Sequence, residues 1–130
     1  MTTSSVSPVT TELAGSETGI TLVIHAGAGS RGKHSTPERI AQVELDLQRA
    51  LDAGYQLLES GAPAHEAVVA AIHVMEDAPE FNAGRGAALT SDGIAQMDAC
   101  LMTGDGEVGA VTGVSTVKNP IDAARAVKEQ

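Results

Sequence analysis

Hydrophobic residues recur at helical spacing between residues 37 and 60. Apolar side chains return there every three or four positions, and the positions between them are largely charged or polar. Ser35 or Thr36 can cap the start of a helix, and Pro37 fits its first turn. Gly61 ends the pattern. The helix predicted here buries one stripe of side chains: Ile40, Val43, Leu47, Ala50, Leu51, Gly54 and Leu58.

Two further helices follow from the same kind of pattern. The second extends from about Pro63 to Glu76 and is ended by Pro79. The third begins at Pro120, with Asn119 as the expected cap and an acidic residue in the first turn, where the helix dipole favours it. The stripe expected to be buried on the second helix is Ala67, Val68, Ala71, Ile72 and Met75.

Shorter apolar runs predict strands. Residues 20–25 are rich in Ile, Leu and Val, which is typical of a strand buried on both faces. Residues 94–102 and 110–114 predict an antiparallel hairpin that turns at residues 104–106. Helices and strands together predict an α/β (α+β) domain over residues 20–130, with helices layered on a sheet. Residues 1–19 have too few large apolar groups to offset the entropy of ordering and are predicted to be a loose tail.

Composition narrows the range of functions. Apolar residues make up 42% of the 130 residues but aromatic residues only 2%, so the core must be built from small aliphatic side chains that let backbones approach closely. The net charge of −9 opposes binding to nucleic acid or to anionic membranes. A single cysteine and the lack of an export or membrane-spanning pattern lead us to expect a cytoplasmic location.

Several candidate sites are weak on their spacing alone. Residues 27–32 (GAGSRG) match the glycine spacing of a dinucleotide-binding loop, but the helix signals begin only after residue 34, whereas that motif opens its helix within the glycines. His65 and His73 are eight positions apart on one helix, about 12 Å, too far to share a metal ion. Cys100 shares a strand face with Asp98 and is interpreted as a small core residue.

Two glycine-rich loops remain, at residues 26–29 and 81–87. Glycine permits positive φ angles and close approach of the main chain to a ligand, so both loops could present N–H or C=O groups. Glycine also marks ordinary tight turns. The residues alone leave both interpretations open.

Four blocks, in this order, carry a family resemblance: residues 23–29 (VIHAGAG), 81–86 (FNAGRG), 97–102 (MDACLM) and 109–114 (GAVTGV), the last followed by Asn119 and Pro120. Over residues 20–130 the chain resembles the N-terminal part of the α-subunit of plant-type asparaginases and isoaspartyl peptidases. These enzymes belong to the N-terminal nucleophile hydrolase superfamily.

The resemblance implies a precursor with an αββα sandwich that cleaves itself to expose a threonine nucleophile at the start of a β-subunit. It implies hydrolysis of L-asparagine or of isoaspartyl dipeptides by an (αβ)₂ assembly that requires no cofactor. Asn82 matches a residue beside the nucleophile, and His25, Ala26 and Gly27 match a loop near the cleavage site, where Ala26 replaces the usual glycine. A structural sodium ion is implied on main-chain carbonyls of Met75, Glu76, Ala78, Phe81, Ala83 and Arg85.

The threonine itself is absent from the matching stretch. Residues 106–111 (GEVGAV) are superficially similar to the family's cleavage junction, but Glu107 stands where the threonine would be. We therefore expect the nucleophile to lie in a β-subunit outside this chain, and this segment alone to be inactive. The alternatives are a non-catalytic remnant or interaction module of the same fold, and a dinucleotide-binding domain that uses the GAGSRG loop.

Overall fold

The computed structural model describes residues 19–26 and 36–130. The predicted tail, except Gly19, lies outside the described residues. So do Gly27 and the whole GAGSRG stretch of the dinucleotide-binding alternative.

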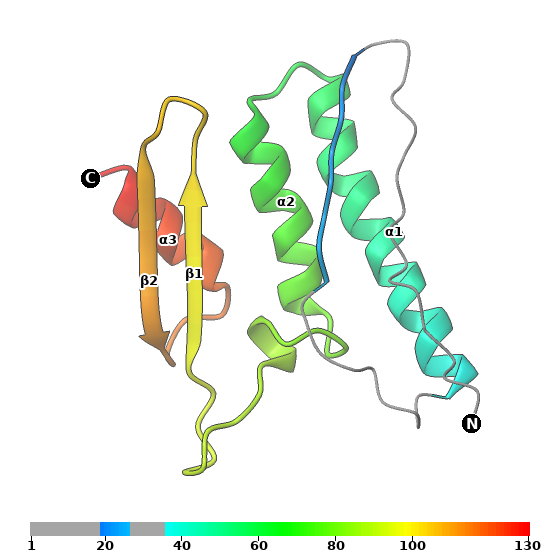
Figure 1. Cartoon of the computed structure of the whole chain (residues 1–130), viewed down its shortest axis with the longest axis vertical. Helices are drawn as coiled ribbons and strands as arrows, with labels where there is room; N and C mark the ends of the chain where they lie inside the picture. The colour runs from blue at the N-terminus through cyan, green and yellow to red at the C-terminus, as the bar shows by residue number, and fades with distance from the viewer. Residues whose placement is uncertain (1–18, 27–35) are drawn as a thin grey trace, which may run out of the picture.

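Two antiparallel helices, α1 (Pro37–Glu59) and α2 (Ala64–Asp77), lie side by side (Figure 1). The predicted start of α1 is confirmed, because the Thr36 side chain accepts a hydrogen bond from the Arg39 N–H at 3.3 Å. The helices approach closely at Gly54, where an added Cβ would lie 2.8 Å from the Ala67 carbonyl oxygen. This contact is the close backbone packing that the small aliphatic composition predicted.

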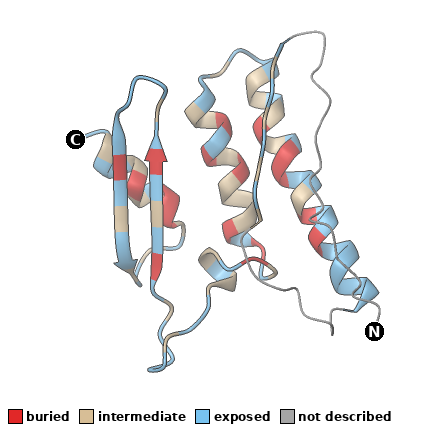
Figure 2. Ribbon diagram, viewed as in Figure 1, coloured by how far each residue is buried: buried red, intermediate tan, exposed pale blue. Residues whose placement is uncertain are grey.

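Most of the predicted stripe on α1 is buried. One position on α1 and one position on α2 differ from the prediction. Ile40 is 46% exposed. On α2, Val68 is exposed and Val69 is buried in its place (Figure 2). The reason is that α2 packs on two sides, since Ala67 and Ala71 face α1 whereas Val69 belongs to a core cluster formed with the third helix. A single stripe could not describe a helix with two partners.

The strand predicted at residues 20–25 is not formed within the described part of the chain. Residues 19–26 form a thin extended segment beside α1 and α2, coloured blue in Figure 1. Burial alternates along the segment: Leu22 and Ile24 are half-buried, whereas Val23 is 75% exposed. The alternation is that of a strand with one covered face. Because the side chains of one face are exposed, the prediction of burial on both faces was wrong.

The predicted hairpin is present as β1 (Met97–Met102) and β2 (Val108–Val114). β1 begins three residues later than expected, because residue 95 instead forms an isolated bridge with Leu89. The register shifts between Met97 and Ala99, and Gly113 opposite has φ +63°, so the hairpin contains a bulge. The strands form a two-stranded antiparallel sheet.

Helix α3 (Pro120–Lys128) covers one face of this hairpin. Leu101, Ile121 and Ala124 form a buried cluster with Val69 of α2, and Gly109 lets the main chain of α3 approach the sheet. Cys100 lies on the opposite, uncovered face and is exposed, so its assignment to the core was wrong. Side chains on that face contact solvent in the described structure: Asp98, Cys100, Met102, Val108, Ala110 and Thr112.

The described chain is therefore a mixed α/β fold in which α3 covers one face of a small sheet, whereas α1 and α2 pack on each other. Within residues 19–26 and 36–130, none of the helices combines the length and the apolar composition of a membrane span.

Candidate functional site

The segment after α2 folds into a tight loop. The helix ends at Asp77 because the next residue, Ala78, is extended and Pro79 cannot continue the hydrogen-bond ladder. The loop leads into a single 3₁₀ turn, η1 (Gly84–Gly86). Phe81 is only 4% exposed and anchors the loop in a cluster with Val43. This anchor leaves the next residue, Asn82, at the surface.

Asn82 has a defined orientation despite its exposure. Its Oδ1 accepts a hydrogen bond from the Ala88 N–H at 2.8 Å, which closes the loop over η1. No partner for the Asn82 side-chain NH₂ group is found in the described part of the chain, so two donors face outward. An oriented amide donor is suited to hydrogen-bonding a polar group that arrives from outside this segment.

The structure brings two of the predicted site segments together. Ala26 packs against the cluster formed by Val43, Ala78 and Phe81, so the end of the extended segment meets the loop that carries Asn82. His25 precedes this contact and is exposed. Gly27, the third predicted residue of this segment, lies outside the described residues.

Main-chain oxygens converge around the two glycines of η1. A Cβ added at Gly84 would lie against the Glu76 carbonyl oxygen, and one added at Gly86 would lie against the Phe81 oxygen and 2.6 Å from that of Pro79. Glu76 and Phe81 are two of the six predicted sodium ligands, and a cradle of uncharged hard oxygens suits such an ion. The contacts at Gly84 and Gly86 thus place two of the six predicted carbonyls beside η1. Elsewhere in the described ranges, no three His, Cys, Asp or Glu side chains gather as a metal site would require.

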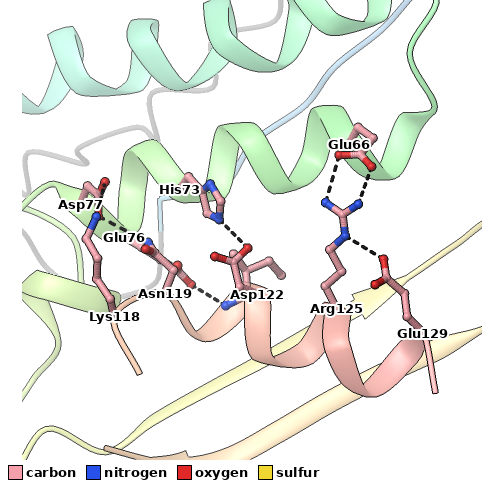
Figure 3. Close-up of polar contacts among 10 residues, drawn as sticks. Glu66, His73, Glu76, Asp77, Lys118, Asn119, Asp122, Arg125 and Glu129 are labelled. Carbon is pink, nitrogen blue, oxygen red and sulfur yellow. Dashed lines mark hydrogen bonds and ion pairs between the residues drawn. The ribbon is translucent and has the colours of Figure 1, made fainter. Parts of the chain in front are cut away.

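Glu76 has a second role that the sequence analysis missed. Its side chain is buried, and Oε1 accepts a hydrogen bond from the Ile121 N–H at 3.0 Å (Figure 3). Glu76 therefore supplies the cap of α3. Asn119 occupies the predicted N-cap position, but its side chain makes no capping hydrogen bond, because its amide donates to Asp77. Burial raises the pKa of the Glu76 carboxyl, against opposing contributions from the Asn119 amide and the Ile121 N–H.

A signal for this role was present in the sequence. Glu76 follows Ile72 by four positions and so lies on the apolar face of α2. A carboxylate on a buried face needs a hydrogen-bond donor nearby, since an unpaired buried charge is costly. The donor, on a helix 45 positions later, could not be identified without the fold.

Polar contacts continue along the facing sides of α2 and α3 (Figure 3). The two terminal guanidinium nitrogens of Arg125 donate hydrogen bonds to the Glu66 carboxylate, at 2.6 and 3.0 Å. His73 Nε2 lies 2.7 Å from Asp122 Oδ1. Each contact joins one particular position of α3 to one particular position of α2. Together they fix how far the two helices are displaced along one another.

The asparaginase family model matches residues 18–130. The chain is 46% identical over 112 residues to a plant-type L-asparaginase of Pyrococcus abyssi. The matched region covers 85% of this chain and 35% of that protein. It is 41% identical to an isoaspartyl peptidase of Escherichia coli, over 84% of this chain and 35% of that protein.

A vertebrate relative gives the same result. An isoaspartyl peptidase/L-asparaginase of Bos taurus is 40% identical over 110 residues, covering 84% of this chain and 35% of that protein. The chain thus spans about a third of the length of the curated relatives it matches.

Proposed function

This chain belongs to the asparaginase family, and from that membership we propose that it is the N-terminal part of a threonine amidohydrolase. The substrates would be L-asparagine, isoaspartyl dipeptides or both. The observation that carries the proposal is the family match over residues 18–130, with 40–46% identity to relatives whose names give these two activities.

The proposed division of labour places the nucleophile outside this chain. A β-subunit from the same precursor would begin with a threonine whose hydroxyl attacks the substrate amide and whose own amino group acts as base. The fold would then be an αββα sandwich, assembled as (αβ)₂ in the cytoplasm. Self-cleavage would release the amino group that the mechanism needs.

Residues of this chain would form one side of the proposed active site. Asn82 would orient the nucleophile by hydrogen bonding, because its amide donors face outward from a loop closed by the Ala88 N–H. His25, Ala26 and Gly27 would lie close to the cleavage site. A sodium ion held by the main-chain oxygens of residues 75–85 would supply a fixed positive charge that stabilises the loop.

The test is hydrolysis by the complete enzyme that the proposal requires, purified after expression with its downstream coding sequence. We expect release of ammonia from L-asparagine, or of aspartate from β-aspartyl-leucine. The matched variant Asn82→Ala should lower kcat by about tenfold or more if it orients the nucleophile. Its control, Gln48→Ala, removes an exposed side chain on α1 that donates a hydrogen bond to Asp52. Lack of turnover of either substrate by the wild-type enzyme contradicts the proposal.

A further inference from the structure

We propose that Glu76 is a positioning residue, which holds the loop carrying Asn82 in place by joining it to the N-terminus of α3. The catalytic part of this inference rests on the proposed function. Its structural part rests only on contacts that Glu76 makes with two segments distant in the sequence.

The first contact is made by the side chain. Glu76 is 4% exposed, and its Oε1 accepts the Ile121 N–H at 3.0 Å (Figure 3). Oε2 has no hydrogen-bond partner in the described part of the chain, so the hydrogen bond that joins this carboxylate to α3 is made by Oε1. α3 is itself immobilised, because Ile121 and Ala124 are buried in the cluster with Leu101. Glu76 is therefore bonded to a fixed element.

The second contact is made by the main chain of the same residue. Gly84 packs directly on Glu76, and a Cβ placed there would lie against the Glu76 carbonyl oxygen and 2.7 Å from its Cβ. Gly84 follows Asn82 by two positions, within the loop that the Asn82–Ala88 hydrogen bond closes. The backbone of Glu76 is thus a surface on which this loop rests.

The two contacts together connect α3 to Asn82. If the side chain loses its bond to Ile121, the end of α2 can shift, and the loop packed on Glu76 shifts with it. Phe81 anchors the other side of the loop in the cluster with Val43 and Ala78. Loss of Glu76 should therefore loosen the part of the loop around Asn82 and η1, while the Phe81 anchor remains.

A pair of nearly isosteric variants separates the acceptor from the volume of the side chain. In the complete enzyme, Glu76→Met removes the acceptor without leaving an unpaired charge, whereas Glu76→Gln keeps an oxygen for the Ile121 N–H. We expect Glu76→Met to lower kcat for L-asparagine by about ten- to hundredfold with little change in KM, and Glu76→Gln to restore most of it. The rate of amide hydrogen exchange over residues 81–88 should rise in Glu76→Met but not in Glu76→Gln. If Glu76→Met does not fold, Glu76→Asp, which cannot reach Ile121, replaces it.

Lys118→Ala is the control, because it breaks the exposed 3.0 Å ion pair with the neighbouring Asp77 and leaves Glu76 intact. It should alter neither kcat nor exchange over residues 81–88. Equal exchange in Glu76→Met and the wild type overturns the inference. So does a Glu76→Met variant that only melts earlier, with kcat unchanged, since that is a purely structural role. A wild-type enzyme inactive on both substrates overturns the proposed function instead, and the exchange comparison still decides whether Glu76 anchors the loop.

Discussion

Two carboxylates, Glu76 and Asp98, both accept main-chain hydrogen bonds but lie in opposite surroundings. Glu76 is buried, and burial raises its pKa. Asp98 is exposed, and its Oδ1 accepts the Gly113 N–H and the Thr112 hydroxyl, each at 2.8 Å. These two hydrogen bonds favour the charged form and lower the pKa of Asp98. Asp98 thereby satisfies the main chain at the bulge of the hairpin.

The lowered pKa of Asp98 makes a pH-dependent prediction. The unfolded chain binds the proton more readily than the folded one, so the stabilisation from the charge is present above the ordinary value of 3.8 and is lost as the pH falls through the lowered pKa. Asp98→Asn resembles the protonated residue. We expect it to melt below the wild type at pH 7 and together with it at the lowest pH, as followed by circular dichroism of the complete enzyme. A difference in melting temperature that is the same at all pH values contradicts this role.

The surroundings of some residues could be predicted from the sequence and those of others could not. Asn82 follows a buried aromatic residue and precedes two glycines, so its place in a surface loop could be predicted from local signals. The exposure of Cys100 could not be predicted, because a strand pattern does not say which face of the sheet is covered. The cap supplied by Glu76 depends on a helix distant in the sequence, and no local pattern contains it.

Among the loops, the turn at η1 is the most constrained. Gly84 has φ +50° and packs on the main chain of Glu76, so a side chain there is strained twice, by its backbone conformation and by contact. Gly93 has φ +75° but nothing within 4 Å of an added Cβ. A side chain would therefore be strained by the backbone conformation at both glycines, but it would meet a close contact at Gly84 and not at Gly93.

This difference gives a controlled test of the loop. In the complete enzyme, Gly84→Val should misplace Asn82 and lower kcat by about tenfold or more, whereas Gly93→Val should cost only about 1–3 kcal/mol of stability. Melting temperatures in sodium chloride and in choline chloride should differ for the wild type and for Gly93→Val, but not for Gly84→Val. If Gly84→Val retains both its activity and its sodium-dependent stability, the loop is only a connector.

Helices and the hairpin were predictable because their signals are local. Spacing, caps and turn glycines placed α1, α2 and β2 to within two residues of the structure. The extended segment at residues 19–26 was not predictable from local signals. A strand is defined by its pairing partner, and no described segment provides one.

At the scale of the whole molecule, uncovered apolar surface is the main feature. Val23, Leu89, Met102 and Val108 are each more than half exposed, and one face of the hairpin contacts solvent. In the proposed enzyme this surface would be covered by the remainder of the precursor. The exposed main-chain edges of the two strands and of the extended segment would be paired there as well.

The 130-residue chain by itself should therefore be poorly folded and inactive. We expect a broad thermal transition by circular dichroism, association on size-exclusion chromatography, and no turnover of L-asparagine, because the proposed nucleophile and its neighbouring strands would lie outside this chain. A monomer with a sharp cooperative melt contradicts the structural expectation. Turnover that persists after removal of contaminating enzyme contradicts the catalytic one.

The most direct test of the central claim is N-terminal sequencing of the enzyme that turns over L-asparagine or β-aspartyl-leucine. If the chain is part of a self-cleaving threonine amidohydrolase, the active fraction contains two chains. One contains the present sequence, and the other begins with a threonine encoded downstream of Gln130. An active enzyme that consists of one uncleaved chain, or whose second chain begins with a different residue, contradicts the account.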